Sequence, residues 1–509
     1  MTQAKNKTDK YFETGHLEKN LKARAVRGGS FTVGGQAARF LLRLSSTAVL
    51  ARLLSPEDYG LMGMTLVVSG FAGVIADGGL IHATVQKETI SHKETSLLFW
   101  INLAFSIAIA AALVLISPLF ALLFHDDRLG PLLIALSSTF VINGCSVQHK
   151  ALLRRNMKFG RIAVVDIASI FSGIVAAIVL ASYGFGYWAL VWLEIVKSFV
   201  TLVLSWVFLG WVPAAFSWDR GILSTLKFGG NIIVYNVVNY ISRNADNLLI
   251  GWYWGAASLG LYTRAYSLLL LPIRNVNAPF SSVAIPVLSR AKSELSKLKR
   301  YFVEAASLVA AVVIPIVACT AVFADDIVLI FLGEKWMETA SLFRFLSVPA
   351  LLFGASQPIS WLYVVLDRTH LLRNVGMISA PVNVAAFCIG LPFGPLGVAK
   401  AYMVSSCLLY FPVLIYALKG TGIAVMDVLR TWNQPLLAAF AGAAVGLLFK
   451  FVILAQQPKI MTAIVSISVF SVVYALVMAV AFNWRQRAAD WFLKKRRPGV
   501  GASVSEPAS

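Results

Sequence analysis

Residues 229–263 read GGNIIVYNVVNYISRNADNLLIGWYWGAASLGLYT, an apolar stretch with charged and amide side chains in its middle. About 20 apolar residues suffice to cross a membrane as a helix, so this stretch is long enough to begin a second crossing. The polar positions are spaced by three, four and three residues, and a helix therefore presents them on one face. They are Asn236, Asn239, Arg243 and Asp246. Because a charge that faces lipid costs about 3 kcal/mol, we expect this face to point into protein or water.

The whole chain has the composition of an integral membrane protein. Of its 509 residues 58% are hydrophobic and 13% are charged, whereas soluble domains carry about 25% charged residues. Apolar runs of about 20 residues follow one another with short links, which predicts one all-α, polytopic membrane body of about 14 transmembrane helices. The predicted spans are 28–54, 58–85, 95–121, 130–149, 160–182, 186–210, 224–251, 258–288, 301–323, 339–365, 374–392, 395–418, 432–454 and 460–483.

The distribution of Lys and Arg predicts the orientation of these spans. If both termini are cytoplasmic, most Lys and Arg residues fall in cytoplasmic segments, and the opposite face holds only Arg128, Lys335 and Lys459 outside the spans. The positive-inside rule therefore favours cytoplasmic termini, with a basic segment at 1–27 and a basic, disordered tail at 485–509. The net charge of +20 is explained by this topology and by contact with anionic lipids. It does not indicate nucleic-acid binding, because no folded basic domain is predicted.

An internal repeat becomes visible when the chain is shifted by 200 residues, which aligns 29–63 with the opening stretch. Arg43 then matches Arg243, and Gly60 matches Gly260. Six crossings return a chain to the same side, so the two halves share one orientation. This predicts two six-helix lobes around a central cavity, related by an axis along the membrane normal. The predicted parts are an N-lobe at 28–210, a C-lobe at 211–418, and two extra helices within 419–484.

Span 28–54 also carries a polar stripe, and the 200-residue shift aligns it with the stripe of the opening stretch. Gln36, Arg39, Arg43 and Ser46 have the same spacing as the stripe in the opening stretch. Arg264 and Arg274 lie ten residues apart on span 258–288, which places them about 80° apart around that helix, so both are able to reach one cavity. Such an arginine-rich cavity suits an anionic head group, because guanidinium forks bind phosphate. The candidate substrate-binding residues are Gln36, Arg39, Arg43, Asn236, Asn239, Arg243, Asp246, Arg264 and Arg274.

Other interpretations of the charges inside the spans stay open. Arg243 and Asp246, three residues apart, would also be able to neutralise each other, which is compatible with a place in the cavity. Glu194 and Lys197 have the same spacing, and we expect them to form a structural ion pair. Asp166 is expected to be a buried, hydrogen-bonded acid.

Motifs of soluble enzymes are absent from the sequence. It contains no P-loop, no GxSxG and no HExxH, and its six histidines and four cysteines lack metal-ligand spacing. The acidic pairs Asp126–Asp127 and Asp325–Asp326 are predicted to be solvated charges in short loops. We therefore expect no cofactor, no metal and no enzymatic activity.

Several stretches resemble one family of transporters, and the resemblance extends over most of residues 20–420. It is to the polysaccharide-transport (Wzx-type) branch of the multidrug/oligosaccharidyl-lipid/polysaccharide flippase superfamily, with colanic-acid-type exporters closest in look. The stretches are RNADNLLIGWYWGAASLGLYTRAYSLLLLP (243–272), PFSSVAIPVLSRA (279–291), LLSPEDYGLMGM (53–64), GLIHATVQ (79–86) and ALLRRNMKFGRIAVVDIAS (151–169).

The resemblance implies a flippase in a bacterial inner membrane. Such proteins move an undecaprenyl-diphosphate-linked oligosaccharide repeat from the cytoplasmic to the periplasmic leaflet, through two lobes that enclose a cationic cavity. It further implies coupling to a proton or sodium gradient, for which Asp77, Asp166 and Asp246 are the candidates. A polysaccharide polymerase and co-polymerase are implied as partners.

Two alternatives remain at this point. Another transporter of the superfamily, such as a drug/cation antiporter or a peptidoglycan-precursor flippase, would share the fold, although a cation exporter needs an acidic cavity. A membrane polysaccharide polymerase would carry a large outward loop, and the sequence predicts only short ones.

Overall fold

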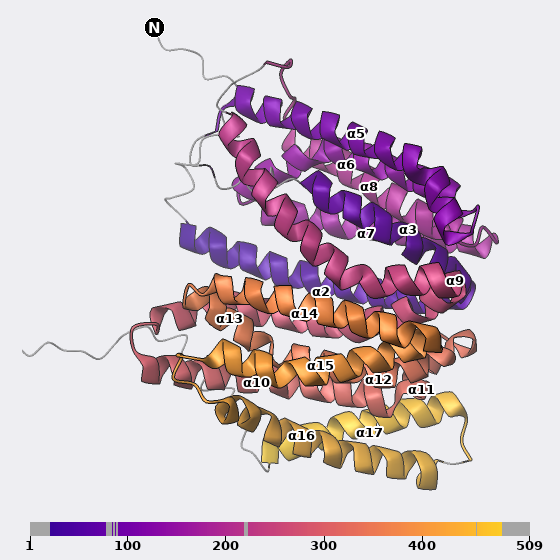
Figure 1. Cartoon of the computed structure of the whole chain (residues 1–509), viewed down its shortest axis with the longest axis vertical. Coiled ribbons are helices and arrows are strands. Elements are labelled where there is room, and N and C mark those ends of the chain that lie inside the picture. The colour runs from indigo at the N-terminus through magenta and orange to yellow at the C-terminus, as the bar shows by residue number, and fades with distance from the viewer. Residues whose placement is uncertain are drawn as a thin grey trace, which may run out of the picture. The chain divides into compact units, whose positions relative to one another are not determined.

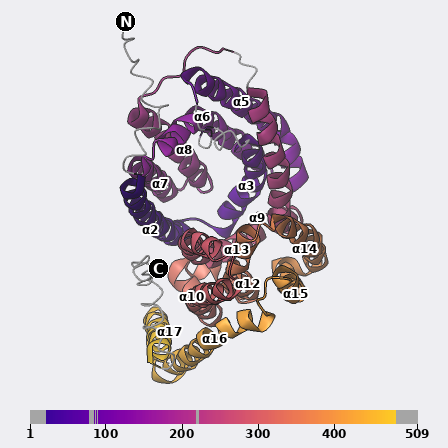
Figure 2. The same cartoon turned by 90° about the vertical axis from the view of Figure 1, so that its left-hand side faces the viewer.

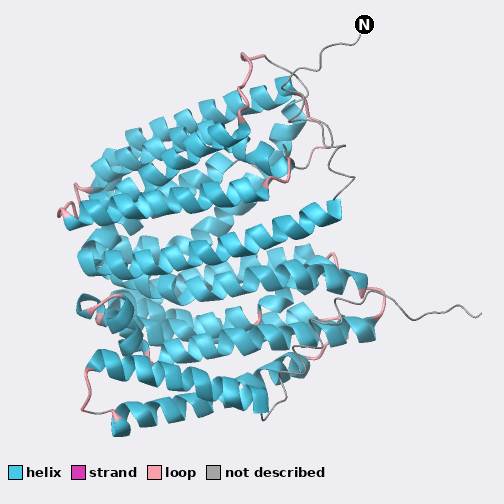
Figure 3. Ribbon diagram, turned by 180° about the vertical axis from the view of Figure 1, so that it is seen from behind, coloured by secondary structure: helices cyan, strands magenta, loops and turns pink. Residues whose placement is uncertain are grey.

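The computed structural model describes residues 21–77, 84, 87, 90–217, 222–454 and 456–480. Within these residues it is helical and contains no strand, which confirms the predicted all-α class (Figure 3). Figure 1 follows the helices in chain order from α2 to α17. Their bounds are α2 Leu21–Leu53, α3 Pro56–Asp77, α5 His92–Phe124, α6 Leu129–Arg155, α7 Phe159–Ser182, α8 Trp188–Leu209, α9 Ile222–Arg290, α10 Leu295–Val322, α11 Ala324–Phe331, η2 Glu334–Trp336, α12 Glu338–Ala355, α13 Gln357–Val365, α14 Thr369–Gly390, η3 Leu391–Phe393, α15 Gly394–Leu418, α16 Val425–Leu448, η4 Phe449–Ile453 and α17 Lys459–Val480.

Among the described residues, 11 helical segments are long and apolar enough to cross a membrane. The chain is therefore a multi-pass membrane protein. Two of these segments, Arg243–Arg290 and His370–Leu418, each include parts of two predicted spans. The first predicted span overlaps α2, which is not one of the 11. Every predicted span thus overlaps a helix, while the number 14 itself stays a prediction.

The long helix α9 is interrupted between its two predicted spans. Gly255 has φ 77° and ψ −176°, a conformation outside the helical region. Glycine adopts positive φ without the steric penalty that a Cβ imposes. The break lies between the predicted spans 224–251 and 258–288, so α9 consists of two helices that meet at Gly255.

The chain forms two compact units. In the first, which comprises residues 1–267, 331–342 and 378–402, α5 packs on α6, α6 and α7 both pack on α8, and α2 packs on α7 (Figure 2). In the second, which comprises residues 268–330, 343–377 and 403–509, α16 packs against α10 and α17. The predicted lobes 28–210 and 211–418 stay a prediction.

A reciprocal close contact inside the first unit follows the 200-residue repeat. A Cβ built on Gly60 of α3 would lie 1.7 Å from the carbonyl oxygen of Ala256, and one built on Gly260 of α9 would lie 1.8 Å from that of Pro56. Gly60 and Gly260 are 200 residues apart, and so are Pro56 and Ala256, so exchanging the two repeats turns one contact into the other. Both positions bring backbone against backbone, which only glycine permits. The two repeats therefore meet through glycines at equivalent positions.

Candidate functional site

An ionic cluster joins three helices of the first unit. Arg39 Nη1 of α2 lies 2.5 Å from Asp166 Oδ2 of α7, and Lys150 Nζ of α6 lies 3.3 Å from Asp166 Oδ1. The side chains of Arg39 and Asp166 are each 24% exposed, so the cluster is half-buried. One carboxylate faces two cations, which leaves the cluster with a net positive charge. Asp166 is hydrogen-bonded, as expected, although it is only half-buried.

The neighbouring residues of the α2 stripe have different environments. Gln36 is half-buried, whereas Arg43 is exposed. The hydroxyls of Ser46 and Thr47 donate to the Arg43 backbone carbonyl at 3.0 and 2.8 Å, which keeps them inside their own helix. Within the described part of the chain, no carboxylate pairs with the Arg43 guanidinium. Arg43 is therefore an uncompensated cation on α2, within the first predicted span.

The stripe on α9 separates into an exposed cation and a buried acid. Arg243 is exposed, and no described carboxylate pairs with it. Asp246 is only 4% exposed and accepts hydrogen bonds from the Tyr262 hydroxyl at 2.9 Å and the Asn247 backbone N–H at 2.8 Å. The alternative that Arg243 and Asp246 neutralise each other is thus not realised. Arg243 is left in the same condition as Arg43, its match in the repeat.

The α9 stripe also includes Asn236 and Asn239. Asn236 is half-buried, and the side chain of Asn239 lies outside the described residues. The same is true of the side chain of Asp77, the last residue of α3. The role of Asp77 as a coupling residue therefore stays a prediction.

Arg264 is held by an aromatic ring instead of an acid. Its guanidinium carbon lies 4.1 Å from the centroid of the Tyr59 ring, and its Nε is buried without a hydrogen-bond partner. Tyr59 in turn meets the Trp336 ring edge-on at 5.4 Å, and Trp336 Nε1 donates to the Ala51 carbonyl at 2.8 Å. A cation–π contact of this kind stabilises a desolvated guanidinium by about 2 kcal/mol. The sequence pattern identified Arg264 and missed its aromatic neighbours, which hydropathy does not distinguish from core residues.

The remaining predicted site residue is Arg274, and the predicted structural ion pair is Glu194–Lys197. Arg274 is exposed and belongs to the second unit. Glu194 and Lys197 form an ion pair within α8, as predicted. The structure thus joins Arg39 to Asp166 and keeps Arg43, Arg243 and Arg264 free of described carboxylates.

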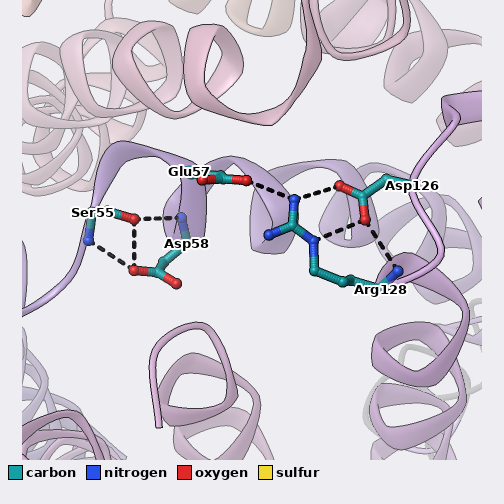
Figure 4. Close-up of polar contacts among 5 residues, drawn as sticks. All are labelled: Ser55, Glu57, Asp58, Asp126 and Arg128. Carbon is teal, nitrogen blue, oxygen red and sulfur yellow. Dashed lines mark hydrogen bonds and ion pairs between the residues drawn. The ribbon is translucent and has the colours of Figure 1, made fainter. Parts of the chain in front are cut away.

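The acidic pairs were predicted to be solvated charges in short loops, and this is wrong for Asp326, which lies in α11 and is only 7% exposed. Arg128 Nε and Nη2 contact the two carboxylate oxygens of Asp126 at 2.9 and 2.8 Å, and Nη2 also reaches Glu57 Oε1 at 2.6 Å (Figure 4). In the second unit, Asp325 pairs with Arg344, and Asp326 pairs with Lys450. Each partner is supplied by a neighbouring turn or a packed helix, which the composition of a loop does not reveal.

The Arg128 cluster ties the α5–α6 turn to the start of α3. The Arg128 guanidinium, hydrogen-bonded to Asp126, holds the pKa of that carboxyl below its usual range, and Asp126 together with Glu57 raises the pKa of Arg128. Beside it, the Ser55 backbone N–H donates to Asp58 Oδ2 at 2.8 Å and the Asp58 N–H donates to Ser55 Oγ at 3.2 Å (Figure 4). This reciprocal capping fixes the first turn of α3.

Asp126→Asn should lower the thermal stability of the purified protein slightly at neutral pH. The folded pKa of Asp126 lies below the unfolded value of about 3.9, so its contribution is present above that value and is lost as the pH falls through the folded pKa. Because Arg128 is 43% exposed, solvent screening limits the effect to below about 1 kcal/mol. Melting curves of wild type and variant should converge in acid. The exposed Asp127 provides the control, since Asp127→Asn should change nothing.

The sequence is similar to those of proteins of polysaccharide biosynthesis. The lipopolysaccharide biosynthesis protein WzxC of Escherichia coli K12 is 23% identical over 406 residues, which cover 78% of this chain and 82% of WzxC. The teichuronic acid biosynthesis protein TuaB of Bacillus subtilis 168 is 25% identical over 348 residues, which cover 65% of this chain and 69% of TuaB. The model of the family described as polysaccharide biosynthesis protein matches residues 49–341.

The fold is shared with solved transporters. The lipid II flippase MurJ in its inward closed conformation matches with a TM-score of 0.73 at 16% identity, covering 90% of this chain and 99% of that one. An inward-facing multidrug resistance transporter of the MATE family matches with a TM-score of 0.60 at 16% identity, covering 77% and 94%. These likenesses confirm the fold class expected from the sequence. Because the family model matches more than half of its residues, the chain belongs to the polysaccharide biosynthesis protein family.

Proposed function

We propose that this chain is a flippase that moves an undecaprenyl-diphosphate-linked oligosaccharide repeat from the cytoplasmic to the periplasmic leaflet of a bacterial inner membrane. The observation that carries the proposal is the pair Arg43 and Arg243. These arginines occupy equivalent repeat positions on predicted spans, both are exposed, and neither has a described carboxylate partner. Uncompensated cations are costly in lipid, so a protein retains them where an anion visits.

The chemistry of the substrate fits this arrangement. A diphosphate joined to a polar sugar cannot cross hydrocarbon unaided, because its charges lose their hydration. Arg43 and Arg243 would each present a planar fork of donors that matches phosphate oxygens. Arg39 is already bound to Asp166, so it would contribute positive electrostatic potential instead of a direct contact with the phosphate. The lobes would enclose the head group in a central cationic cavity, with the lipid tail outside between their edges.

Translocation would follow from rocking of the two lobes, which exposes the cavity to one leaflet and then to the other. Both termini would lie in the cytoplasm, in keeping with the positive-inside distribution of Lys and Arg. On this proposal the chain is a transporter and not an enzyme, and it would deliver its cargo to a polymerase and co-polymerase. The family, and the relatives named for lipopolysaccharide and teichuronic acid biosynthesis, support a polysaccharide precursor as cargo.

A drug/cation antiporter is the second candidate, because the MATE transporter shares the fold. The charges argue against it. A cation exporter needs unpaired carboxylates to attract its substrate, whereas here Asp166 is already bound to Arg39 and Lys150. The exposed charges on the described stripes, Arg43 and Arg243, are positive, and Asp246, which pairs with no described cation, is buried. An anionic head group is therefore the better match.

Depleting the protein from its host should trap the lipid-linked repeat in the cytoplasmic leaflet. A membrane-impermeant glycan label would then react with few repeat units on intact spheroplasts and with many after the membranes are opened. Labelling on intact spheroplasts at the level of undepleted cells would mean that translocation continues. A later step, such as polymerisation, would then become the better assignment.

A further inference from the structure

Residues 331–342 belong to the first unit, although the chain before and after them belongs to the second. This segment turns at Gly333, where φ is 94°, and contains the short helix η2 and the start of α12. Its charged side chains are exposed and its apolar ones are mostly buried, among them Leu332, Trp336 and Ala340. Because both ends continue into the second unit, a movement of that unit relative to the first must carry the segment along or release it.

Trp336 anchors this segment at the end of α2. Its side chain is fully buried, and its indole Nε1 donates to the Ala51 backbone carbonyl at 2.8 Å. This carbonyl lies in the last turn of α2, where helix carbonyls need partners from outside the helix. The N–H four residues on, that of Ser55, donates to Asp58 Oδ2 at 2.8 Å instead. A donor 285 residues away in the sequence therefore caps the helix.

Tyr59 extends this contact to α9. Its ring, which is buried, meets the Trp336 ring edge-on at 5.4 Å and lies 4.1 Å from the guanidinium carbon of Arg264. Edge-on ring pairs and cations over ring faces are both favourable contacts. Three side chains from α3, α9 and the segment 331–342 thus form one stack, next to the end of α2. Removal of the indole alone would uncover the Ala51 carbonyl and one side of Tyr59.

The docked arrangement also has a cost. Arg264 Nε and Thr339 Oγ1 are both buried without a hydrogen-bond partner. A buried polar group without a partner is unfavourable, and water would hydrate both groups if the segment left. Docking therefore gains the contacts of Trp336 and loses hydration elsewhere, which is the balance that a reversible contact needs. On the predicted orientation, the α2–α3 turn and the segment 331–342 both lie on the periplasmic side.

We infer that residues 331–342 form a latch, docked through Trp336 while the periplasmic end of the first unit is closed and released when cargo leaves, an inference that rests on the proposed flippase function. The indole is held by one carbonyl and one ring, so a movement of the second unit withdraws it in a single step. Water then hydrates the Ala51 carbonyl, Arg264 and Thr339. The return of the indole to the end of α2 closes the latch again.

A reducible cross-link tests whether the latch has to open. A Cβ built on Gly333 would lie 3.9 Å from Arg52 Cγ, so cysteines at the exposed residues Arg52 and Glu334 are within reach of a short bifunctional thiosulfonate. The background is the full chain with its four cysteines replaced by alanine. Cross-linking of Arg52→Cys to Glu334→Cys should lower export severalfold and hold the lipid-linked repeat in the cytoplasmic leaflet. Reduction of the link should restore export.

Glu57→Cys with Arg128→Cys is the matched control. These two side chains also meet on the predicted periplasmic side, at 2.6 Å, and both belong to the first unit. Their cross-link should therefore leave export unchanged. Full export by the chain cross-linked between Arg52→Cys and Glu334→Cys would overturn the latch, because the segment would never need to leave. That result would not concern the proposed function, which the labelling of depleted cells decides separately.

Shielding of Thr339 tests release directly, because Thr339 is fully buried whereas Met337 is 38% exposed. On spheroplasts, a membrane-impermeant maleimide should modify Thr339→Cys severalfold faster in a host that makes the lipid-linked repeat than in one that does not. Met337→Cys should react equally in both hosts. Adding Trp336→Ala should make Thr339→Cys react fast in both, and Trp336→Phe, which keeps a ring beside Tyr59, should have a smaller effect. Equal rates for Thr339→Cys in the two hosts, with Trp336 present, would show a fixed strut and overturn the latch.

Discussion

Replacing Arg243 by alanine should abolish polysaccharide export while the chain remains in the membrane at normal abundance. Arg243 is exposed and pairs with no described carboxylate, so its removal breaks no ion pair among the described residues. A charge-assisted hydrogen bond contributes about 1.5–3 kcal/mol. The loss of a two-donor fork on a phosphate therefore slows translocation by about a hundredfold or more, at about 1.4 kcal/mol per factor of ten.

Exported polysaccharide and immunoblots of membrane fractions would be measured side by side. Arg243→Lys tests the geometry of the fork, because it keeps the charge and loses the planar pair of donors; we expect partial export. Lys459→Ala removes another exposed cation, at the start of α17, and should export normally. Full export by Arg243→Ala at normal abundance would show that this arginine faces no substrate.

The corresponding change at Arg39 is less informative. Its partner Asp166 would keep Lys150 as a second cation, so Arg39→Ala mixes a structural loss with any effect on the substrate. The structure thus ranks the candidates from the sequence. On the proposed function, Arg43 and Arg243, which lack described carboxylate partners, would contact the substrate directly, and Arg39 would have a supporting position.

Helical periodicity accounts for what the sequence could predict. The spacing of Arg243 and Asp246 placed them on one helix, and the break between spans 224–251 and 258–288 is found at Gly255. Hydropathy is a property of one segment at a time, so it locates spans well. Span 28–54, which overlaps α2, was predicted as an apolar run like the others, although α2 is not among the 11 described segments apolar enough to cross a membrane.

Contacts between distant segments were beyond the sequence. Arg39 and Asp166 are 127 residues apart, and nothing in either helix indicates that α2 packs on α7. For the same reason Arg264 was noticed as a charge inside a span, while Tyr59, its partner, was not noticed. A charge inside a span is visible in a sequence, but the group that compensates it depends on which helices are neighbours.

The repeat is the exception, because its register predicts equivalent positions and the structure shows a contact at them. Gly260→Ala should lower the thermal stability of the purified chain markedly, since the added Cβ would lie 1.8 Å from the Pro56 carbonyl oxygen. Backbone cannot yield as the end of a flexible side chain does, so α3 and α9 must separate. Overpacking of this kind costs about 1–3 kcal/mol, and occasionally more.

Gly60→Ala should have a similar effect, because its Cβ would lie 1.7 Å from the Ala256 carbonyl oxygen. Gly376→Ala in α14 is the matched control: no atom lies within 4 Å of the new Cβ, so helix propensity alone should stabilise it by up to about 1 kcal/mol. The double variant at Gly60 and Gly260 should lose less stability than the two single losses added together. Once one Cβ has parted the helices, the reciprocal contact is already open and the second Cβ finds space. Fully additive losses would mean that the two glycines act at separate contacts, and that the repeats do not meet as one reciprocal pair.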